Sequence, residues 1–148
     1  MKLALIMVLL TAYWPAFAQI ETEVAYDDGN PNHELQFTRD GVRFVTRFTP
    51  PAPHTQITKA RYFIADTSEG ASFDLTVFRD VSDEPAVILY GPVHITVEQL
   101  AWNEWDLTTS LVYTDDDFYI SLSYDGVSKP MIGAEDRSPT GRAYETDG

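Results

Sequence analysis

Hydrophobic and polar residues alternate along several short segments of this chain. In VRFVTRF (42–48), one face would carry apolar side chains and a threonine, and the other face would carry both arginines. The same alternation recurs in SFDLTVF (72–78) and in FYISLSY (118–124), where Tyr119 would point outward with two serines. A period of two is typical of a β-strand with one buried face, so we predict a strand in each segment.

Two further segments, ITKARYFIA (57–65) and PAVILYGPV (85–93), are rich in β-branched and aromatic residues and are also predicted as strands. Turn-forming residues separate the predicted strands at Asp40-Gly41, TPPAP (49–53), DTSEG (66–70), Asp125-Gly126 and SPTG (138–141). Short strands at this spacing predict an all-β fold, an antiparallel β-sandwich of the jelly-roll type.

One segment, TVEQLAW (96–102), has features of a helix start. Thr96 and Gln99 match a capping box, and Val97, Leu100 and Ala101 would share a helix face. The following residues WNEWDL (102–107) are typical of a strand, which leaves little room for a helix. We therefore expect a loop or a single helical turn here.

The beginning of the chain has the pattern of a secretory signal peptide. Lys2 supplies a positive charge, Leu3–Leu10 is an apolar run, and Ala16-Phe17-Ala18 is a small-x-small cleavage site. The apolar run is shorter than the roughly 20 residues that a membrane-spanning helix needs. We predict a signal peptide at 1–18, a location outside the cell or in the periplasm, and no membrane attachment after cleavage before Gln19.

Composition predicts a single module over residues 19–148 that contains no disulfide. The chain has no cysteine, and it carries 23 acidic against 10 basic residues, for a formal net charge of −13. Such a surface repels nucleic acid and anionic membranes, so neither is an expected partner. It attracts divalent cations, although acidity also serves solubility alone.

Six short motifs follow one another along the chain: Tyr26-Asp27-Asp28-Gly29, Phe48-Thr49-Pro50-Pro51, Tyr62-Phe63-Ile64, Trp102-Asn103-Glu104-Trp105-Asp106-Leu107, Asp117-Phe118-Tyr119-Ile120 and Gly141-Arg142-Ala143-Tyr144. Their order resembles a family of secreted β-sandwich modules of bacterial and archaeal extracellular proteins, often appended to peptidases or other large secreted chains. The resemblance covers nearly all of residues 19–148 and implies an accessory module.

The chain departs from that family pattern in two places. RDVSDEP (79–85) replaces a Gly/Pro-rich loop after the central strand, and the sequence stops at ETDG (145–148), where the family continues through one more short aromatic strand. The second departure suggests a fragment or a module of a longer parent chain, whose other domains would then be partners.

Motifs that would indicate an enzyme are missing from the sequence. It has no GxSxG elbow, HExxH motif, P-loop or dinucleotide fingerprint, and His33, His54 and His94 lack the spacing of a zinc site. A pair of carboxylates can hydrolyse a glycoside, but 23 acidic residues make such pairs inevitable. We expect no catalytic activity.

Calcium is the cofactor that the acidic turns favour, because it binds carboxylate and carbonyl oxygens. The first and last strands of a sandwich can lie side by side, which would bring Asp27 and Asp28 near Asp136 or Asp147. The alternative is that Asp27-Asp28-Gly29 only forms a tight turn. For Asp115-Asp116-Asp117, a polar lead into the next strand is the simpler interpretation.

Trp102, Glu104 and Asp106 form the predicted ligand-binding set. In a regular strand these three would lie on one face, with Trp105 and Leu107 on the other. A tryptophan beside carboxylates can stack on a sugar ring and orient its hydroxyls. The alternative is that a bulge turns Trp102 into the core, where large aromatic residues commonly lie.

Two functions follow from these patterns. The first is a non-catalytic extracellular module for binding or adhesion, acting on a glycan or on a protein surface and stabilised by calcium. The second is a purely structural module that spaces or stabilises a larger secreted enzyme and binds nothing itself.

Overall fold

The computed structural model describes residues 21–24, 33–37, 41–66, 71–97, 100–124, 130–134 and 143–147. The predicted signal peptide lies outside these ranges. Within them, no helix is long and apolar enough to span a membrane.

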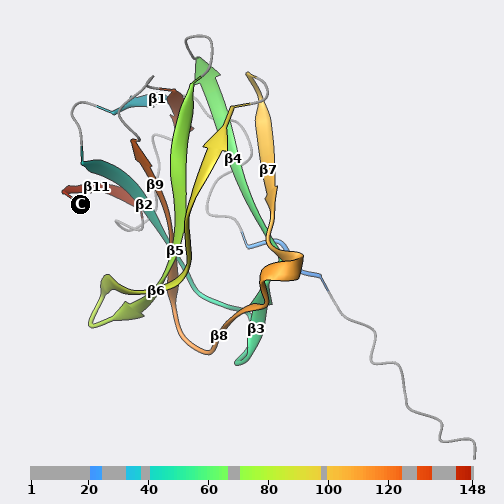
Figure 1. Ribbon diagram of the computed structural model, residues 1–148. Coiled ribbons are helices and arrows are strands. Elements are labelled where there is room, and N and C mark those ends of the chain that lie inside the picture. The colour runs from blue at the N-terminus through green and yellow to red at the C-terminus, as the bar shows by residue number, and fades with distance from the viewer. Residues whose placement is uncertain are drawn as a thin grey trace, which may run out of the picture.

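The described residues form two larger antiparallel sheets and a small two-stranded one (Figure 1). The four-stranded sheet has the order β1 (His33–Gln36), β10 (Met131–Ala134), β4 (Lys59–Asp66), β7 (Trp102–Asp106). The five-stranded sheet has the order β11 (Ala143–Asp147), β2 (Val42–Phe48), β9 (Phe118–Tyr124), β5 (Ser72–Val81), β6 (Glu84–Thr96). The two-stranded sheet pairs β3 (Thr55–Ile57) with β8 (Val112–Thr114).

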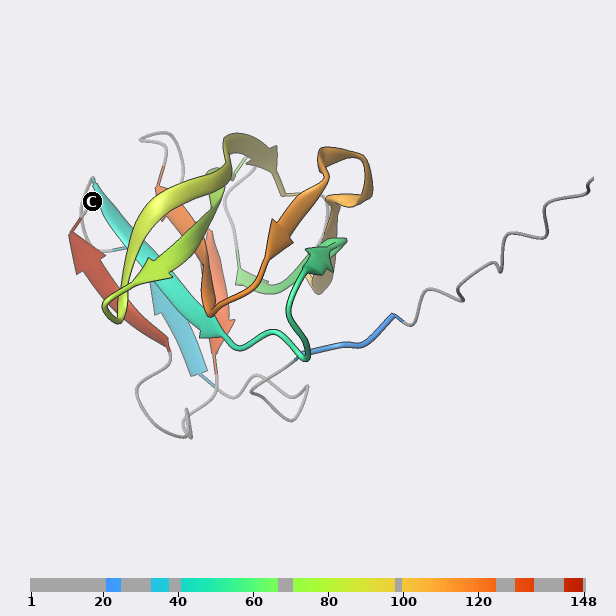
Figure 2. The ribbon, with the colours of Figure 1, turned by 90° about the horizontal axis from the view of Figure 1, so that it is seen from below.

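The strand order is that of a jelly roll, as the sequence predicts. With β3, β8 and β11 set aside, the four-stranded sheet holds the first, eighth, third and sixth strands of the chain. The other sheet holds the second, seventh, fourth and fifth. Strands β3 and β8 interrupt the connections β2–β4 and β7–β9. The small ribbon lies at the lower end of the sandwich in Figure 1, the end that faces the viewer in Figure 2. The all-β antiparallel sandwich is therefore confirmed.

The core lies between the two larger sheets, and the predicted alternation places it correctly. On β5, the side chains of Phe73, Leu75 and Val77 are fully buried. Apolar burial of this kind contributes about 25 cal/mol per Å² of apolar area and is the main source of stability.

The outer face of the five-stranded sheet differs from the prediction, because it is also buried in part. Val45, Phe78 and Tyr119 form a second buried cluster there. Two arginines from β2 cover it: Arg43 lies 5.5 Å above the Phe78 ring, and Arg47 lies 5.9 Å from the Tyr119 ring. Alternation gives the side of the sheet on which a residue lies, but not what lies over that side.

The segment RDVSDEP (79–85) forms a tight hairpin between β5 and β6. Ser82 and Asp83 take φ values of 61° and 67°, which suits a two-residue hairpin turn. The Asp80 side chain accepts a hydrogen bond from the Asp83 N–H at 3.0 Å. This side-chain contact supports a conformation that non-glycine residues seldom adopt.

The strand β6 is longer than predicted and ends at Thr96, while β7 begins at Trp102. Within 96–102, residues 98 and 99 lie outside the described ranges. A single helical turn occurs instead after β7, at the 3₁₀ helix η1 (Thr108–Ser110). It ends at Leu111, whose φ of 52° is left-handed.

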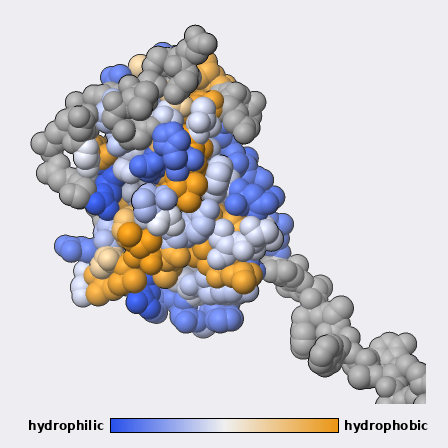
Figure 3. Space-filling view, viewed as in Figure 1, coloured by the Kyte–Doolittle hydropathy of each residue, from blue (hydrophilic) through white to orange (hydrophobic). Residues whose placement is uncertain are grey.

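The outermost strand of the five-stranded sheet, β6, presents apolar side chains to solvent. Val87 and Ile88 are 38% and 53% exposed, and Val81 on the neighbouring β5 is 45% exposed. Apolar side chains cover the region of this hairpin in Figure 3. Residues 85–93 carry no charge, although the chain as a whole is strongly acidic.

Candidate functional site

The outer face of the strand pair β4–β7 carries the predicted binding residues. Leu107 and Asn103 are buried on the inner side, whereas Glu104 and Asp106 are exposed. Antiparallel pairing places Arg61 opposite Glu104 on this pair of strands. The predicted alternation of WNEWDL is therefore present.

Trp102 lies half-buried on this outer face. Its ring packs at 76° against Phe63, with the ring centroids 5.6 Å apart. The guanidinium carbon of Arg61 lies 5.2 Å from the Trp102 ring centroid, in a cation–π contact. The ring is therefore fixed by neighbours from β4, and it also holds Arg61 in place.

Glu104 forms an ion pair with Lys59, whose Nζ lies 3.2 Å from Glu104 Oε1. The hydrogen bond and the charge of Glu104, together with the charge of Glu21, raise the pKa of Lys59 above its ordinary value. Lys59 is therefore a stable cation at neutral pH. It can attract or orient an anionic group, but it is a poor proton acceptor.

Asp106 belongs to the turn that follows β7. Its Oδ1 accepts a hydrogen bond from the Thr108 N–H at 2.7 Å, which opens η1. Hydrogen bonds from Thr108, and then the charge of Lys59, lower the pKa of Asp106. The three predicted residues share one face. Asp106 accepts a hydrogen bond from the backbone of η1, whereas Trp102 and Glu104 contact β4.

A hollow of about 710 Å³ lies beside these side chains, and we call it the β4 groove. This volume is within the range of small-ligand sites, roughly 300–1,000 Å³. Trp102 and Glu104 both line it, and residues 21–24 form part of its wall. The lining also includes four apolar residues and two basic ones: Phe48, Ile57, Phe118, Ile120, Lys59 and Arg61. Aromatic surface and paired charges therefore meet in one depression.

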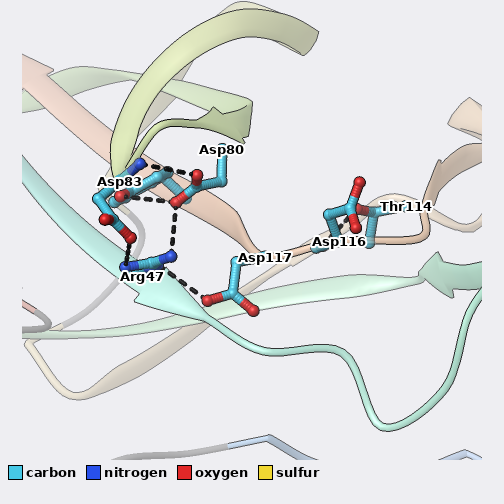
Figure 4. Close-up of polar contacts among 7 residues, drawn as sticks. Arg47, Asp80, Asp83, Thr114, Asp116 and Asp117 are labelled. Carbon is cyan, nitrogen blue, oxygen red and sulfur yellow. Dashed lines mark hydrogen bonds and ion pairs between the residues drawn. The ribbon is translucent and has the colours of Figure 1, made fainter.

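The second polar region centres on Arg47 of β2 (Figure 4). Its Nη2 lies 2.9 Å from Asp80 Oδ2, and its Nη1 lies 2.7 Å from Asp83 Oδ1. Nε lies 2.9 Å from Asp117 Oδ2, in an orientation that makes an ion pair without a hydrogen bond. The Tyr119 hydroxyl donates a hydrogen bond to Asp80 Oδ2 at 3.0 Å. We call these five residues the Arg47 cluster.

Burial alone would lower the pKa of Arg47. The hydrogen bond to Asp83 and the charges of Tyr119, Asp80 and Asp117 outweigh that effect, so the pKa is raised. Arg47 joins β2 to the β5–β6 hairpin and to the residue before β9. Its three carboxylate partners are already paired with a fixed cation, which argues for a structural role.

A shallower hollow of about 520 Å³ lies next to the Arg47 cluster, against the connection from Thr49 to Pro53. Asp115 Oδ1 accepts a hydrogen bond from the His54 N–H at 2.7 Å, and the Asp116 carbonyl accepts one from the Thr114 hydroxyl at 2.6 Å. The run Asp115-Asp116-Asp117 therefore takes part in a turn and an ion pair. Among the described residues, no three acids, histidines or cysteines are grouped so as to hold a metal.

The predicted calcium ligands Asp27, Asp28 and Asp136 lie outside the described residues. Among the described strands, β1 pairs with β10 and β11 pairs with β2. The expected proximity of Asp27 and Asp28 to Asp136 stays a prediction. Asp147 ends β11 opposite Val42, in the five-stranded sheet.

The β1–β10 pairing still bears on the three carboxylates. It places His33 opposite Ala134. The chain before β1 and the chain after β10 therefore leave the four-stranded sheet at the same end. Asp27 and Asp28 precede β1, and Asp136 follows β10.

Two features were missed in the sequence. The Arg47 cluster joins residues far apart in the chain, and only the outward position of Arg47 in VRFVTRF signals it. The basic pair Lys59 and Arg61 has a clearer signal, because the two cations stand two residues apart in a strand and so share a face.

Comparison with protein-family models, with curated proteins and with solved structures finds no match. The resemblance to secreted accessory modules stays a prediction.

Proposed function

We propose that this protein is a non-catalytic extracellular binding module that takes its ligand, a glycan or a segment of protein surface, in the β4 groove. The observation that carries the proposal is the coincidence of that groove with Trp102 and Glu104, which were selected from the sequence alone. A half-buried tryptophan supplies contact area at low entropic cost, and the charges beside it supply orientation.

The charges of the groove suit binding better than catalysis. Lys59 is paired with Glu104, and its raised pKa keeps it protonated at neutral pH. Arg61 is stacked on Trp102. An enzyme acting by general acid–base chemistry would need a group with a pKa near the working pH, whereas the pKa of Lys59 is raised further above neutrality.

Stabilisation by calcium forms part of the same proposal. Its support is the β1–β10 pairing, which places His33 opposite Ala134. The segments that carry Asp27, Asp28 and Asp136 therefore join the four-stranded sheet at the same end. Calcium would act there as a structural ion. Export by the signal peptide at 1–18 and membership of a longer chain with other domains belong to this proposal as well.

The test is a binding screen of the purified protein against a glycan array and immobilised peptides. Trp102→Ala should abolish the binding seen with the wild type. Tyr113→Ala is the matched control, because Tyr113 is also a surface aromatic, 41% exposed and stacked on His54, but lies on β8 outside the groove.

Binding that survives Trp102→Ala would remove the groove from the proposal. Absence of binding to every glycan and peptide would favour the purely structural module.

A further inference from the structure

Residues 21–24, which we call the arm, lie against the lower end of β4 and β7 as extended chain, drawn in blue in Figure 1. Glu23 Oε1 lies 2.8 Å from Arg61 Nη1, and Glu21 Oε1 lies 4.0 Å from Lys59 Nζ. Two carboxylates spaced two residues apart therefore match two cations with the same spacing on β4. Alternate residues of an extended chain lie on the same side, so one extended segment fits another here.

The contacts that hold the arm are weak. All four charged side chains are between 42% and 69% exposed, and ion pairs this exposed add little to stability. Among the described residues, the arm forms no backbone hydrogen bond to β4. The arm can therefore dissociate from β4 at a small cost in free energy.

The two cations are held in place by β7 and would stay there without the arm. Trp102 stacks on Arg61, and Glu104 pairs with Lys59. A receptor that is already ordered binds more tightly, because less side-chain freedom is lost on binding. The arm forms part of the wall of the β4 groove, and the rest of the lining includes the apolar side chain of Phe48.

We propose that the β4 groove is a docking site for an extended acidic segment of another protein, with carboxylates two residues apart, and that the arm covers the two cations of this site in cis until displaced. This inference rests on the proposed function and names the class of ligand. The guanidinium of Arg61 can donate two parallel hydrogen bonds to one carboxylate. Lys59, two residues earlier on β4, supplies a second cation. In a chain of net charge −13, this basic pair also marks a specific position for an acidic partner.

The experiment measures the fluorescence polarisation of a labelled peptide with the sequence of residues 19–25, QIETEVA, titrated with the full chain. The cis arm competes with the peptide, so Glu21→Gln/Glu23→Gln should bind it about tenfold more tightly than the wild type. Lys59→Gln/Arg61→Gln should abolish binding. Arg79→Gln, an exposed arginine on β5 outside the groove, should leave the affinity unchanged. Circular dichroism confirms that each variant is folded.

A matched peptide, QIQTQVA, tests whether charge decides recognition. Equal affinity for both peptides, or equal affinity of the wild type and Glu21→Gln/Glu23→Gln, overturns the inference. Sedimentation velocity of the unlabelled chain measures whether the protein binds a second copy of itself. If the chain forms a dimer that the peptide dissociates, the arm of a second copy is the ligand. That result would overturn the inference that the ligand belongs to another protein.

The emission of Trp102, taken as the difference between the wild type and Trp102→Phe, separates this inference from the proposed function. If the peptide fails but an oligosaccharide changes that emission, the acidic-segment inference falls and the binding module stands. If no ligand changes it and none binds in the screen, both fall.

Discussion

The Arg47 cluster and the β4 groove use the same parts in opposite ways. Each has an arginine that lies over an aromatic ring and pairs with carboxylates, but Arg47 is 27% exposed and Arg61 is 45% exposed. Arg47 has three carboxylate partners from separate strands and turns, whereas Arg61 is paired with Glu23 of a four-residue arm.

The difference lies in what each carboxylate is tied to. Asp80 is 11% exposed and is held by Tyr119 and by the Asp83 N–H as well as by Arg47. Glu23 is 67% exposed. An ion pair inside a network of fixed groups supports the fold, while an ion pair to a loosely held segment leaves a cation that a ligand can take over.

The largest expected effect is that of Arg47→Met, which leaves three aspartates without their cation. Removing one partner of a partly buried charged network should lower the free energy of unfolding by about 3 kcal/mol, and the thermal midpoint by roughly 10 °C. Denaturant unfolding measures the change.

Arg61→Met is the matched control, because it also removes an arginine from above an aromatic ring. Since its ion pair is exposed, it should change the free energy of unfolding by at most about 1 kcal/mol. Equal losses for the two variants would erase the distinction between the two regions.

Calcium should distinguish the acidic residues that pair with Arg47 from those proposed to bind a metal. Calcium at about 100 times its Kd stabilises a folded protein by roughly 2.7 kcal/mol. We expect the thermal midpoint to rise in calcium relative to EDTA, and the rise to disappear in Asp27→Asn/Asp28→Asn.

Asp116→Asn is the control for calcium, because Asp116 lines the hollow beside the Arg47 cluster and is exposed. It should keep the full shift. A shift lost in Asp116→Asn and kept in the double variant would move the metal to the Arg47 side.

Tyr119→Phe removes one hydrogen bond from the Arg47 cluster and leaves Asp80 its other partners. The expected loss is about 1 kcal/mol in the free energy of unfolding. In Tyr113→Phe, the lost hydroxyl donates only a 3.4 Å hydrogen bond to Gln56 at an exposed site, so the same measurement should show no change. If Tyr119→Phe left the free energy of unfolding unchanged, the contacts of Asp80 with Arg47 and with the Asp83 N–H would be sufficient to order it.

The smallest effect concerns Asp106 and appears as a pH dependence. Its pKa is lowered in the folded state, so its stabilising contribution is complete above the unfolded value of about 3.9. That contribution is lost as the pH falls through the folded pKa. The wild type should be slightly more stable than Asp106→Asn at neutral pH, and the two should converge below about pH 4. A gap that widens in acid would contradict this assignment.

The sequence predicted the strands β2, β5, β7 and β9 because burial of one face imposes a strict period of two, and it predicted β4 and β6 from their β-branched and aromatic residues. The short strands β1, β3, β8, β10 and β11 were not predicted. The period of two gave the inward face of β5 and the outward direction of Trp102 and Glu104. It also shows Lys59 and Arg61 on one face, although this pair was overlooked. Contacts along one strand, or across a neighbouring pair, leave a local trace.

The Arg47 cluster left almost no such trace, because it depends on which distant strands become neighbours. Arg47 meets Asp80 only because β2 and β5 both flank β9. Asp106 shows a second limit. The face of the strand on which Asp106 lies was predicted correctly. However, its carboxylate accepts a hydrogen bond from the Thr108 N–H at the start of η1. Alternation along a strand does not predict such side-chain hydrogen bonds to the backbone.

The strand β6 carries a consequence for how the protein behaves in concentrated solution. Residues 85–93 form an uncharged outer strand with exposed Val87 and Ile88, and such an edge is a template for pairing with another chain. At neutral pH the net charge of −13 keeps copies apart. That repulsion vanishes near the sequence pI of about 4.3. In mild acid, we therefore expect copies of the protein to associate through this edge.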